Sequence, residues 1–150
     1  MPNVISDSSC LIALDNIDML FVLRALYGKI YVTEEVSDEF GKGLEDWVEI
    51  RQIKDRNCMR ILNSLIDPGE ASTIALSLEI QDSLMILDDR KARKVARNLD
   101  AKFTGLLGVI LRAKQERVIH SAKEALDKLR SAKFRISKAV EEKVLRLANE

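Results

Sequence analysis

The sequence predicts an α/β fold in which a small parallel sheet of four to five strands is flanked by helices. Short apolar, β-branched runs alternate with helical patterns along the chain, as parallel strands joined by crossover helices require. Residues 84–87 (Leu-Met-Ile-Leu) run directly into Asp88 and Asp89 and then into a basic helical pattern, which is typical of a buried parallel strand. At 150 residues the chain has the length of one domain with a sizeable core, so we expect a single domain over residues 1–150.

Local signals predict each element of the first half of the chain. Asp7 and Thr33 each follow a short strand pattern and each offer an N-cap side chain for the helix that comes next. Apolar spacing predicts the helices between and after them. The expected elements are a strand at 4–6, helices at 9–14 and 19–27, a strand at 29–33, a helix to about residue 40, an edge strand or extended arm at 47–53, and a helix at 58–66.

The second half begins with a strong helix start at Asp67, Pro68 and Glu70, which supply a cap, a proline at the first position and an acid in the first turn. After the strand at 84–87 we expect a basic helix at 90–99, a last short strand at 101–104, and helices at 105–114, 121–129 and 137–148. The core of the domain is expected in residues 1–115, with C-terminal helices in 116–150.

Composition excludes several classes of protein. No run of about 18 apolar residues exists that could cross a membrane, and the N-terminal residues lack the regions of a signal peptide, so we expect a cytoplasmic protein. Cys10 and Cys58 have no metal-site or disulfide spacing and are expected to be small core side chains. The formal net charge is zero, but the segment from Arg90 to Lys138 holds 15 of the 24 basic residues and 4 of the 24 acidic ones. Such a segment forms either solvated helix faces or a binding surface for a polyanion.

Acidic residues follow the predicted strands, and the carboxyl ends of parallel strands meet at one edge of a sheet. Asp7 ends the first strand, Asp88 and Asp89 end a later one, and Glu70 opens a helix that can reach the same edge; Glu39 lies on the helix after the second strand. Carboxylates gathered without basic partners repel each other, and Mg²⁺ or Mn²⁺ bound between them removes that repulsion. A metal-activated water at such a site can attack a phosphodiester.

Each acid also has a purely structural interpretation. Asp7 and Asp89 can be helix caps, and Glu70 can complement a helix dipole. Glu39 can be a surface residue, with Glu35 or Asp38 facing the site in its place.

Polar and basic side chains near these acids are candidates for substrate binding, because arginine and hydroxyl groups hold phosphates. The expected substrate-binding residues are Ser9, Arg90, Arg93, Arg97 and Thr104. Lys91 and Lys94 extend the basic patch, whereas His120 lies outside the acid group and is expected to be structural. The aromatic residues are scattered, so stacking of bases is not indicated.

Five short segments resemble a known family: 4–9 (VISDSS), 36–39 (VSDE), 68–75 (PGEASTIA), 86–90 (ILDDR) and 104–111 (TGLLGVIL). The chain resembles a PIN domain, the metal-dependent nuclease fold that includes VapC-type toxins of toxin–antitoxin pairs, over residues 1 to about 115. The elements Gly-Glu-Ala, Leu-Asp-Asp-Arg and Gly-Leu-Leu-Gly are similar to a poorly characterised prokaryotic branch of PIN-like proteins.

The resemblance implies a three-layer α/β/α fold and a Mg²⁺/Mn²⁺-dependent endoribonuclease, the toxin of a VapBC-type pair. It implies that the acids of the site are Asp7, Glu39, Glu70 and one or both of Asp88 and Asp89, with the metal held by Asp7, Glu70, Asp88 and Asp89. It further implies RNA as substrate, a cognate antitoxin as partner and a homodimer.

Two other interpretations remain open from the sequence. The same fold can be catalytically inactive and bind RNA or a protein, and a metal titration distinguishes this case. A receiver-type phosphoacceptor domain also gathers acids at strand ends, but it needs an acid pair after the first strand and a downstream lysine on a strand, where Lys102 is poorly placed.

Overall fold

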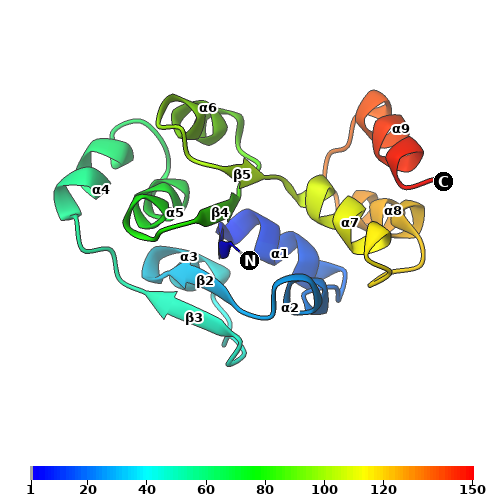
Figure 1. The fold of residues 1–150 in the computed structure, drawn as a ribbon, viewed down its shortest axis with the longest axis horizontal. Helices are drawn as coiled ribbons and strands as arrows, with labels where there is room; N and C mark the ends of the chain where they lie inside the picture. The colour runs from blue at the N-terminus through cyan, green and yellow to red at the C-terminus, as the bar shows by residue number, and fades with distance from the viewer. Residues whose placement is uncertain (1) are drawn as a thin grey trace.

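The computed structural model describes residues 2–150 and contains a five-stranded, wholly parallel sheet in the order β3-β2-β1-β4-β5 (Figure 1). Met1, the first residue of the predicted domain, lies outside the described residues. The strands are β1 (Asn3–Ser6), β2 (Ile30–Thr33), β3 (Val48–Arg51), β4 (Ser83–Ile86) and β5 (Phe103–Thr104). β1 is the central strand, and it pairs with β4 over its full length, from Asn3 opposite Ser83 to Ser6 opposite Ile86. The predicted parallel sheet is therefore confirmed.

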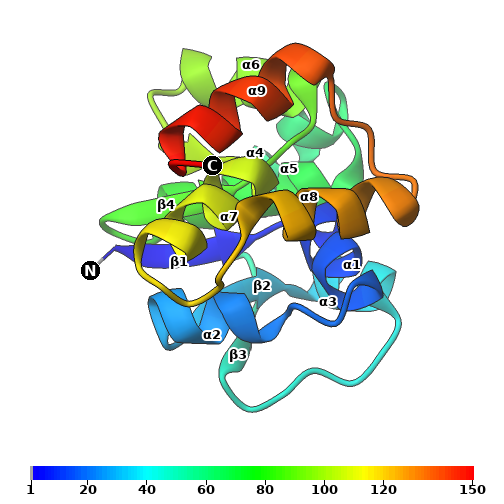
Figure 2. The ribbon, with the colours of Figure 1, turned by 90° about the vertical axis from the view of Figure 1, so that its right-hand side faces the viewer.

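Helices cover both faces of the sheet and make three layers, as predicted (Figure 1, Figure 2). Their bounds are α1 (Ser8–Asn16), α2 (Phe21–Tyr27), α3 (Glu34–Phe40), α4 (Arg56–Asn63), α5 (Pro68–Glu79), α6 (Arg90–Asn98), α7 (Leu106–Gln115), α8 (Ala122–Ser131) and α9 (Lys138–Leu147). Within the described residues, no helix is long and apolar enough to cross a membrane.

Side-chain caps determine where most of these helices begin. Asp7, Thr33 and Asp89 each accept a hydrogen bond from the backbone N–H three residues ahead, which satisfies a donor that the first turn leaves free. Asp55 does the same for α4, so that helix begins two residues before the predicted start at Cys58. Asp67 makes no such bond, and α5 begins instead with Pro68 at its first position.

Alternating residues of the central strands point to opposite faces of the sheet and pack into two separate apolar layers. Val4 and Ile86 face one side of the sheet, where they pack with α1, α2, α7 and α8. Ile5 and Met85 face the other side, where they pack with α4, α5 and α6. Because both faces of the central strands are buried, the middle residues of β1 and β4 are apolar, and their polar residues lie at the strand ends.

The C-terminal helices α8 and α9 extend the first of these layers beyond α7. The carboxylate of Glu150 accepts hydrogen bonds from the N–H of Ala122 at 2.6 Å and from the hydroxyl of Ser121 at 2.9 Å, at the start of α8. Lys114 of α7 lies 3.3 Å from the same carboxylate. These contacts fasten the segment after α9 to both neighbouring helices.

Candidate active site

Asp7 is a buried carboxylate with one unpaired oxygen. It follows β1 and caps α1, where its Oδ1 accepts a hydrogen bond from the N–H of Cys10 at 3.0 Å. Its Oδ2 is buried and, within residues 2–150, has no hydrogen-bond partner. The pKa of Asp7 rises to about 7, mainly because the carboxyl group is buried. The negative charges of Asp88 and Glu70 raise this pKa further, while the hydrogen bonds from Cys10 lower it.

Asp88 is half-buried at the end of β4 and is held by three elements of the fold. The N–H of Leu106, at the start of α7, lies 3.2 Å from each of its carboxylate oxygens. The thiol of Cys10 donates to Oδ2 at 3.2 Å, and Nη2 of Arg93 donates to Oδ1 at 3.1 Å. Arg93 is itself fixed, because its Nε donates to the carbonyl of Leu87 at 2.7 Å.

Gly105 allows this arrangement because it has no side chain. A Cβ on residue 105 would lie 2.6 Å from Oδ1 of Asp88 and would also overlap Nη2 of Arg93. Gly108 similarly leaves room for the hydroxyl of Thr104. The two glycines therefore permit close packing at the start of α7.

Glu39 and Glu70 lie on the neighbouring helices α3 and α5. The hydroxyl of Ser8 donates to Oε2 of Glu39 at 2.8 Å, and Gly69 lies directly against the same carboxylate, where a Cβ would overlap it. Glu35 instead faces Arg56, at 3.7 Å. The structure therefore places Glu39, rather than Glu35, beside the start of α5.

Glu70 is half-buried in the first turn of α5. Burial raises its pKa, and the nearby negative charges of Asp89, Asp67 and Glu39 raise it further. Asp89 is exposed and caps α6, where its Oδ2 accepts from the N–H of Ala92 at 2.9 Å. The capping interpretation of Asp89 is therefore confirmed, while its charge still acts on Glu70.

The acids thus form one group at the carboxyl edge of the sheet. The charges of Asp88 and Glu70 raise the pKa of Asp7, and those of Asp89 and Glu39 raise the pKa of Glu70. Over residues 2–150, no three Asp, Glu, His or Cys side chains already surround one metal position. The donors nevertheless fit a hard divalent cation, because they are all carboxylates and Oδ2 of Asp7 is buried with no partner among the described residues. Asp7, Glu70 and Asp88 are the side chains that would hold such an ion.

The basic residues predicted for substrate binding gather beside this group. Arg90, Arg93 and Arg97 line a groove that Asp88 also lines, and Lys94 joins them, whereas Lys91 does not. The guanidinium groups of Arg93 and Arg97 each lie 5.3 Å from the centre of the Phe103 ring. A stacked guanidinium keeps its charge and a fixed direction, which suits it to contact a phosphate.

Two hydroxyl residues that the sequence predicts for substrate binding, and one cysteine, lie around this group. Ser9 is exposed and lines a separate groove with Leu129, while it is Ser8 that contacts an acid. Thr104 lies against Gly108 at the end of β5. Cys10 is buried as predicted, but it also contacts both acids, and burial raises its thiol pKa so that it stays a neutral donor. The only sequence signal for the contact between Cys10 and Asp7 is the position of Cys10 three residues after this helix cap.

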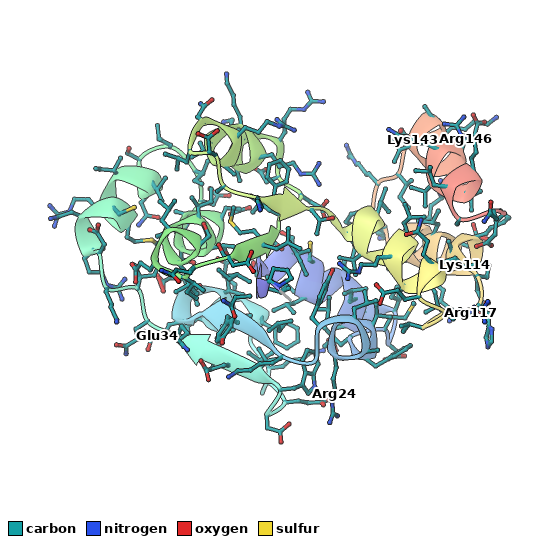
Figure 3. All side chains as sticks on the ribbon, in the orientation of Figure 1. Arg24, Glu34, Lys114, Arg117, Lys143 and Arg146 are labelled. Carbon is teal, nitrogen blue, oxygen red and sulfur yellow. The ribbon has the colours of Figure 1, made fainter. Side chains whose placement is uncertain are left out.

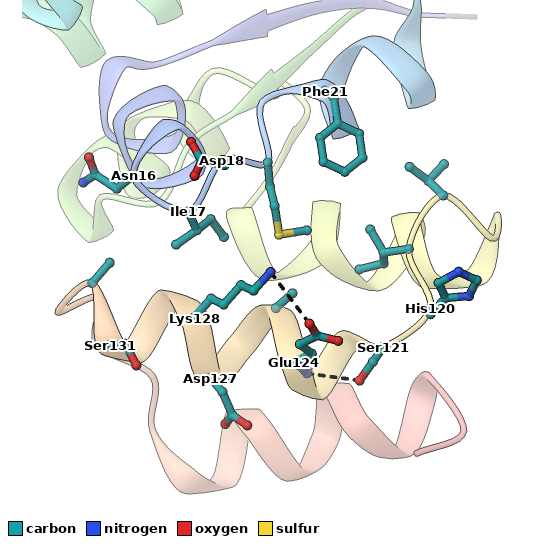
Figure 4. A pocket seen from close by; sticks show the side chains of 15 residues that line it. Asn16, Ile17, Asp18, Phe21, His120, Ser121, Glu124, Asp127, Lys128 and Ser131 are labelled. Atoms are coloured by element: carbon teal, nitrogen blue, oxygen red, sulfur yellow. Dashed lines mark hydrogen bonds and ion pairs between the residues drawn. The ribbon is translucent and has the colours of Figure 1, made fainter.

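His120 lies apart from the acids. Its exposed side chain lines a groove between the Asn16–Phe21 segment and α8, as Figure 4 shows. Its backbone carbonyl accepts a hydrogen bond from Nζ of Lys114 at 2.7 Å. The position of His120 agrees with the prediction that it is not part of the acid site.

Comparison with known proteins gives one finding. A family model described as a PIN domain matches residues 3–150 of the chain, which includes the acid group, α6 and the C-terminal helices. No curated protein matches the chain.

Proposed function

The chain belongs to the PIN-domain family, whose members are generally nucleases, and from this premise we propose that it is a Mg²⁺/Mn²⁺-dependent endoribonuclease. The observation that supports this most is the unpaired, buried Oδ2 of Asp7 beside Asp88 and Glu70. A carboxyl group in such a position either takes up a proton or has its charge compensated. A divalent cation provides this compensation and also serves the chemistry of phosphodiester hydrolysis.

A bound Mg²⁺ or Mn²⁺ supplies an activated water and neutralises the charge that develops on the phosphate. The chain's own residues position it. Asp7 offers Oδ2 from the end of β1, and Glu70 and Asp88 offer oxygens from α5 and the end of β4. Glu39, held by Ser8, places a second carboxylate beside Glu70, and such a carboxylate would accept the proton that an attacking water loses.

The N-terminus of α7 and the basic face of α6 complete the proposed site. The N–H of Leu106 orients Asp88, so the position of this acid depends on the β5–α7 junction. Arg90 and Arg97 place positive charge next to the acids, where an RNA phosphate would lie. Ser9 and Thr104 stay candidates for a substrate contact, with a weaker geometric basis than the arginines.

A Mn²⁺ titration by calorimetry tests this function. We expect saturable binding by the wild-type protein that is lost in Asp7→Asn and in Asp88→Asn. The exposed acid Asp127, on α8, provides a matched control, since Asp127→Asn removes the same charge outside the site. Absence of saturable binding at millimolar Mn²⁺ would overturn the metal-dependent mechanism.

A second candidate function is a catalytically inactive PIN-like domain that binds RNA or a protein. The observation in its favour is that Arg93 already neutralises Asp88, so one acid of the group has a cation from the chain itself. In that case wild-type protein and Asp7→Asn would behave alike in the Mn²⁺ titration.

The finer assignment to the toxin of a VapBC-type pair, with an antitoxin partner and a homodimer, extends the family resemblance. Induced expression should arrest growth only with the acid group intact, so Asp7→Asn should relieve the arrest. Sedimentation of the purified protein should give twice the mass of one chain, 17.0 kDa. Growth that is unaffected by the wild-type protein would remove the toxin assignment.

A further inference from the structure

A basic groove runs from the acid group to the C-terminal helices. It has a volume of about 850 Å³ and lies between α6 on one side and the 132–137 connection with the start of α9 on the other. Gly105, Leu107 and Gly108 of the β5–α7 junction also line it, together with Asp88. Figure 1 shows α6 and α9 on either side of this junction, and Figure 2 shows the two helices on the same edge of the molecule.

The charge of the groove is almost entirely positive. Arg90, Arg93, Lys94 and Arg97 come from α6, and Arg135 comes from the opposite wall, nearly forty residues further along the chain. The one acid, Asp88, already contacts Arg93. In the part of the chain that the structure describes, the other four cations form no ion pair, although acids are as abundant as bases in the sequence. Unpaired cations that converge from two walls attract a polyanion.

The opposite wall is also partly apolar. Phe134, Ile136 and Val140 alternate there with Arg135 and Ser137, and Val140 is 42% exposed. Phosphates satisfy cations, while unpaired bases cover aromatic and aliphatic side chains. A duplex hides its bases and presents only phosphates and groove edges, so it would leave this apolar wall uncovered. The mixed lining therefore favours a single strand.

We propose that this groove holds an unpaired RNA strand and that Arg135, supplied by the C-terminal segment, is a phosphate-binding residue of the site. The strand would run between α6 and α9 and pass the carboxylates at Asp88. This inference rests on the function proposed above and adds a substrate contact from outside the core of the domain. It also gives the C-terminal helices a role, since α8 and α9 position Arg135 and Phe134 opposite α6.

Binding without metal tests the groove separately from the chemistry. A fluorescein-labelled, unstructured oligoribonucleotide is titrated in EDTA, with anisotropy measured over a range of salt concentrations. Loss of one phosphate contact on a single strand lowers the salt slope of the binding constant by about 0.7, or about fivefold in affinity at roughly 0.1 M salt. We expect this change for Arg135→Gln and for Arg97→Gln, and weaker binding of a duplex of the same sequence.

Arg24 provides the matched control, because it is an exposed arginine on α2, on the opposite edge of the molecule from α9 (Figure 3). Arg24→Gln should leave both the affinity and the salt slope unchanged. Ultraviolet cross-linking of the bound strand should give adducts in the peptide that contains Phe134. Circular dichroism confirms that each variant is folded before it is titrated.

Several outcomes would overturn the proposal: no binding of the strand, equal effects of Arg135→Gln and Arg24→Gln, duplex binding as tight as that of the single strand, or adducts confined to other peptides. Binding of polyglutamate in place of RNA would assign the groove to an acidic protein segment. Because the RNA titration is done in EDTA, it does not depend on metal. A protein that binds the strand but does not bind Mn²⁺ would refute the nuclease function and support the RNA-binding groove. A protein that binds Mn²⁺ but not the strand would refute only the RNA-binding groove.

Discussion

Arg93 and Asp88 form an ion pair at the carboxyl edge of the sheet, with Nη2 of the arginine 3.1 Å from Oδ1 of the carboxylate. The guanidinium is fixed by the carbonyl of Leu87 and by the ring of Phe103, so its charge stays next to the acid group. An arginine in this place neutralises part of the repulsion between Asp88 and Asp7. It also competes with any metal ion for Oδ1 of Asp88.

Replacing Arg93 should therefore change metal affinity and stability in opposite directions. We expect Arg93→Gln to bind Mn²⁺ more tightly, by about tenfold, which corresponds to about 1.4 kcal/mol. The metal-free variant should melt at a lower temperature, because Asp88 loses its cation. Calorimetry and thermal unfolding in EDTA measure the two effects. Lys91→Gln removes one charge from the same helix outside the groove, and equal results for both variants would contradict this role of Arg93.

The buried charge of Asp7 should make the metal-free protein less stable as pH rises. Its pKa is about 7 in the folded state against 3.8 as a model value, so the folded state binds the proton more tightly. Stability is then lost between about pH 4 and pH 7, by at most about 4 kcal/mol for three pKa units. Asp7→Asn keeps the acceptor for Cys10 and removes the charge, so it should be more stable at pH 8 by roughly 2 kcal/mol.

Urea unfolding in EDTA at several pH values measures this difference. The advantage of Asp7→Asn should shrink as pH falls from 7 toward 4, because the carboxyl of the folded wild-type protein is then protonated. Asp127→Asn, at an exposed position, should follow the wild-type curve at every pH. A less stable Asp7→Asn at pH 8 would show that the carboxylate is compensated within the chain.

Gly105 should be intolerant of even one methyl group. Gly105→Ala would place a Cβ against Arg93 and Asp88, so we expect a loss of about 1–3 kcal/mol in the free energy of unfolding and weaker Mn²⁺ binding. Gly43 has no atom within 4 Å of the corresponding Cβ position, and its φ is not positive, so Gly43→Ala should be neutral or slightly stabilising. Equal stability of the two variants would contradict the close packing at residue 105.

Glu150 should fasten α9 in a pH-dependent way. Burial opposes its ionisation, but the N–H groups of Ala122 and Lys123, the Ser121 hydroxyl and Lys114 together lower its pKa to about 2 (Figure 3 labels Lys114 beside the C-terminal helices). We call these contacts of the Glu150 carboxylate the Glu150 clamp. Because the pKa is lowered, the clamp contributes its full stability above the ordinary pKa of 4.5 and loses it as pH falls toward 2.

Hydrogen exchange of the α9 amides measures this clamp. We expect Glu150→Gln to exchange faster than wild type at pH 6, because a neutral amide makes weaker bonds to the same donors. Glu142 lies exposed on α9 and serves as control. Protection of α9 that is equal in Glu150→Gln and Glu142→Gln would contradict the clamp.

The elements of the fold could be predicted from the sequence because their signals are local. Asp7, Thr33 and Asp89 cap the helices that follow them, and Pro68 starts α5, as their positions indicate. The strand order β3-β2-β1-β4-β5 has no such local signal, because it depends on which strands pair across the sheet. The boundaries that moved, such as the start of α4, depend on which of several polar residues caps the helix.

The acid group could be predicted in outline, because strand ends must meet at one edge. Its details could not. Ser8 rather than Ser9 contacts Glu39. The two serines are neighbours on α1 and point in different directions, and the sequence does not say which of them faces the acids. The contact between Arg93 and Asp88 depends on the space that Gly105 leaves, and the second wall of the basic groove depends on how residues 132–137 return to α6. These relationships join segments far apart in the chain, and no local pattern encodes them.

The central claim is that the acids at the sheet edge act together on RNA through a divalent cation. Cleavage of a labelled, unstructured RNA by purified wild-type protein, compared in Mn²⁺ and in EDTA, tests it most directly, with Asp7→Asn and Asp127→Asn alongside. We predict internal cleavage in Mn²⁺ by the wild type and by Asp127→Asn, and no cleavage in EDTA or by Asp7→Asn. Cleavage that persists in Asp7→Asn, or its absence from the wild type in Mn²⁺, would contradict the account.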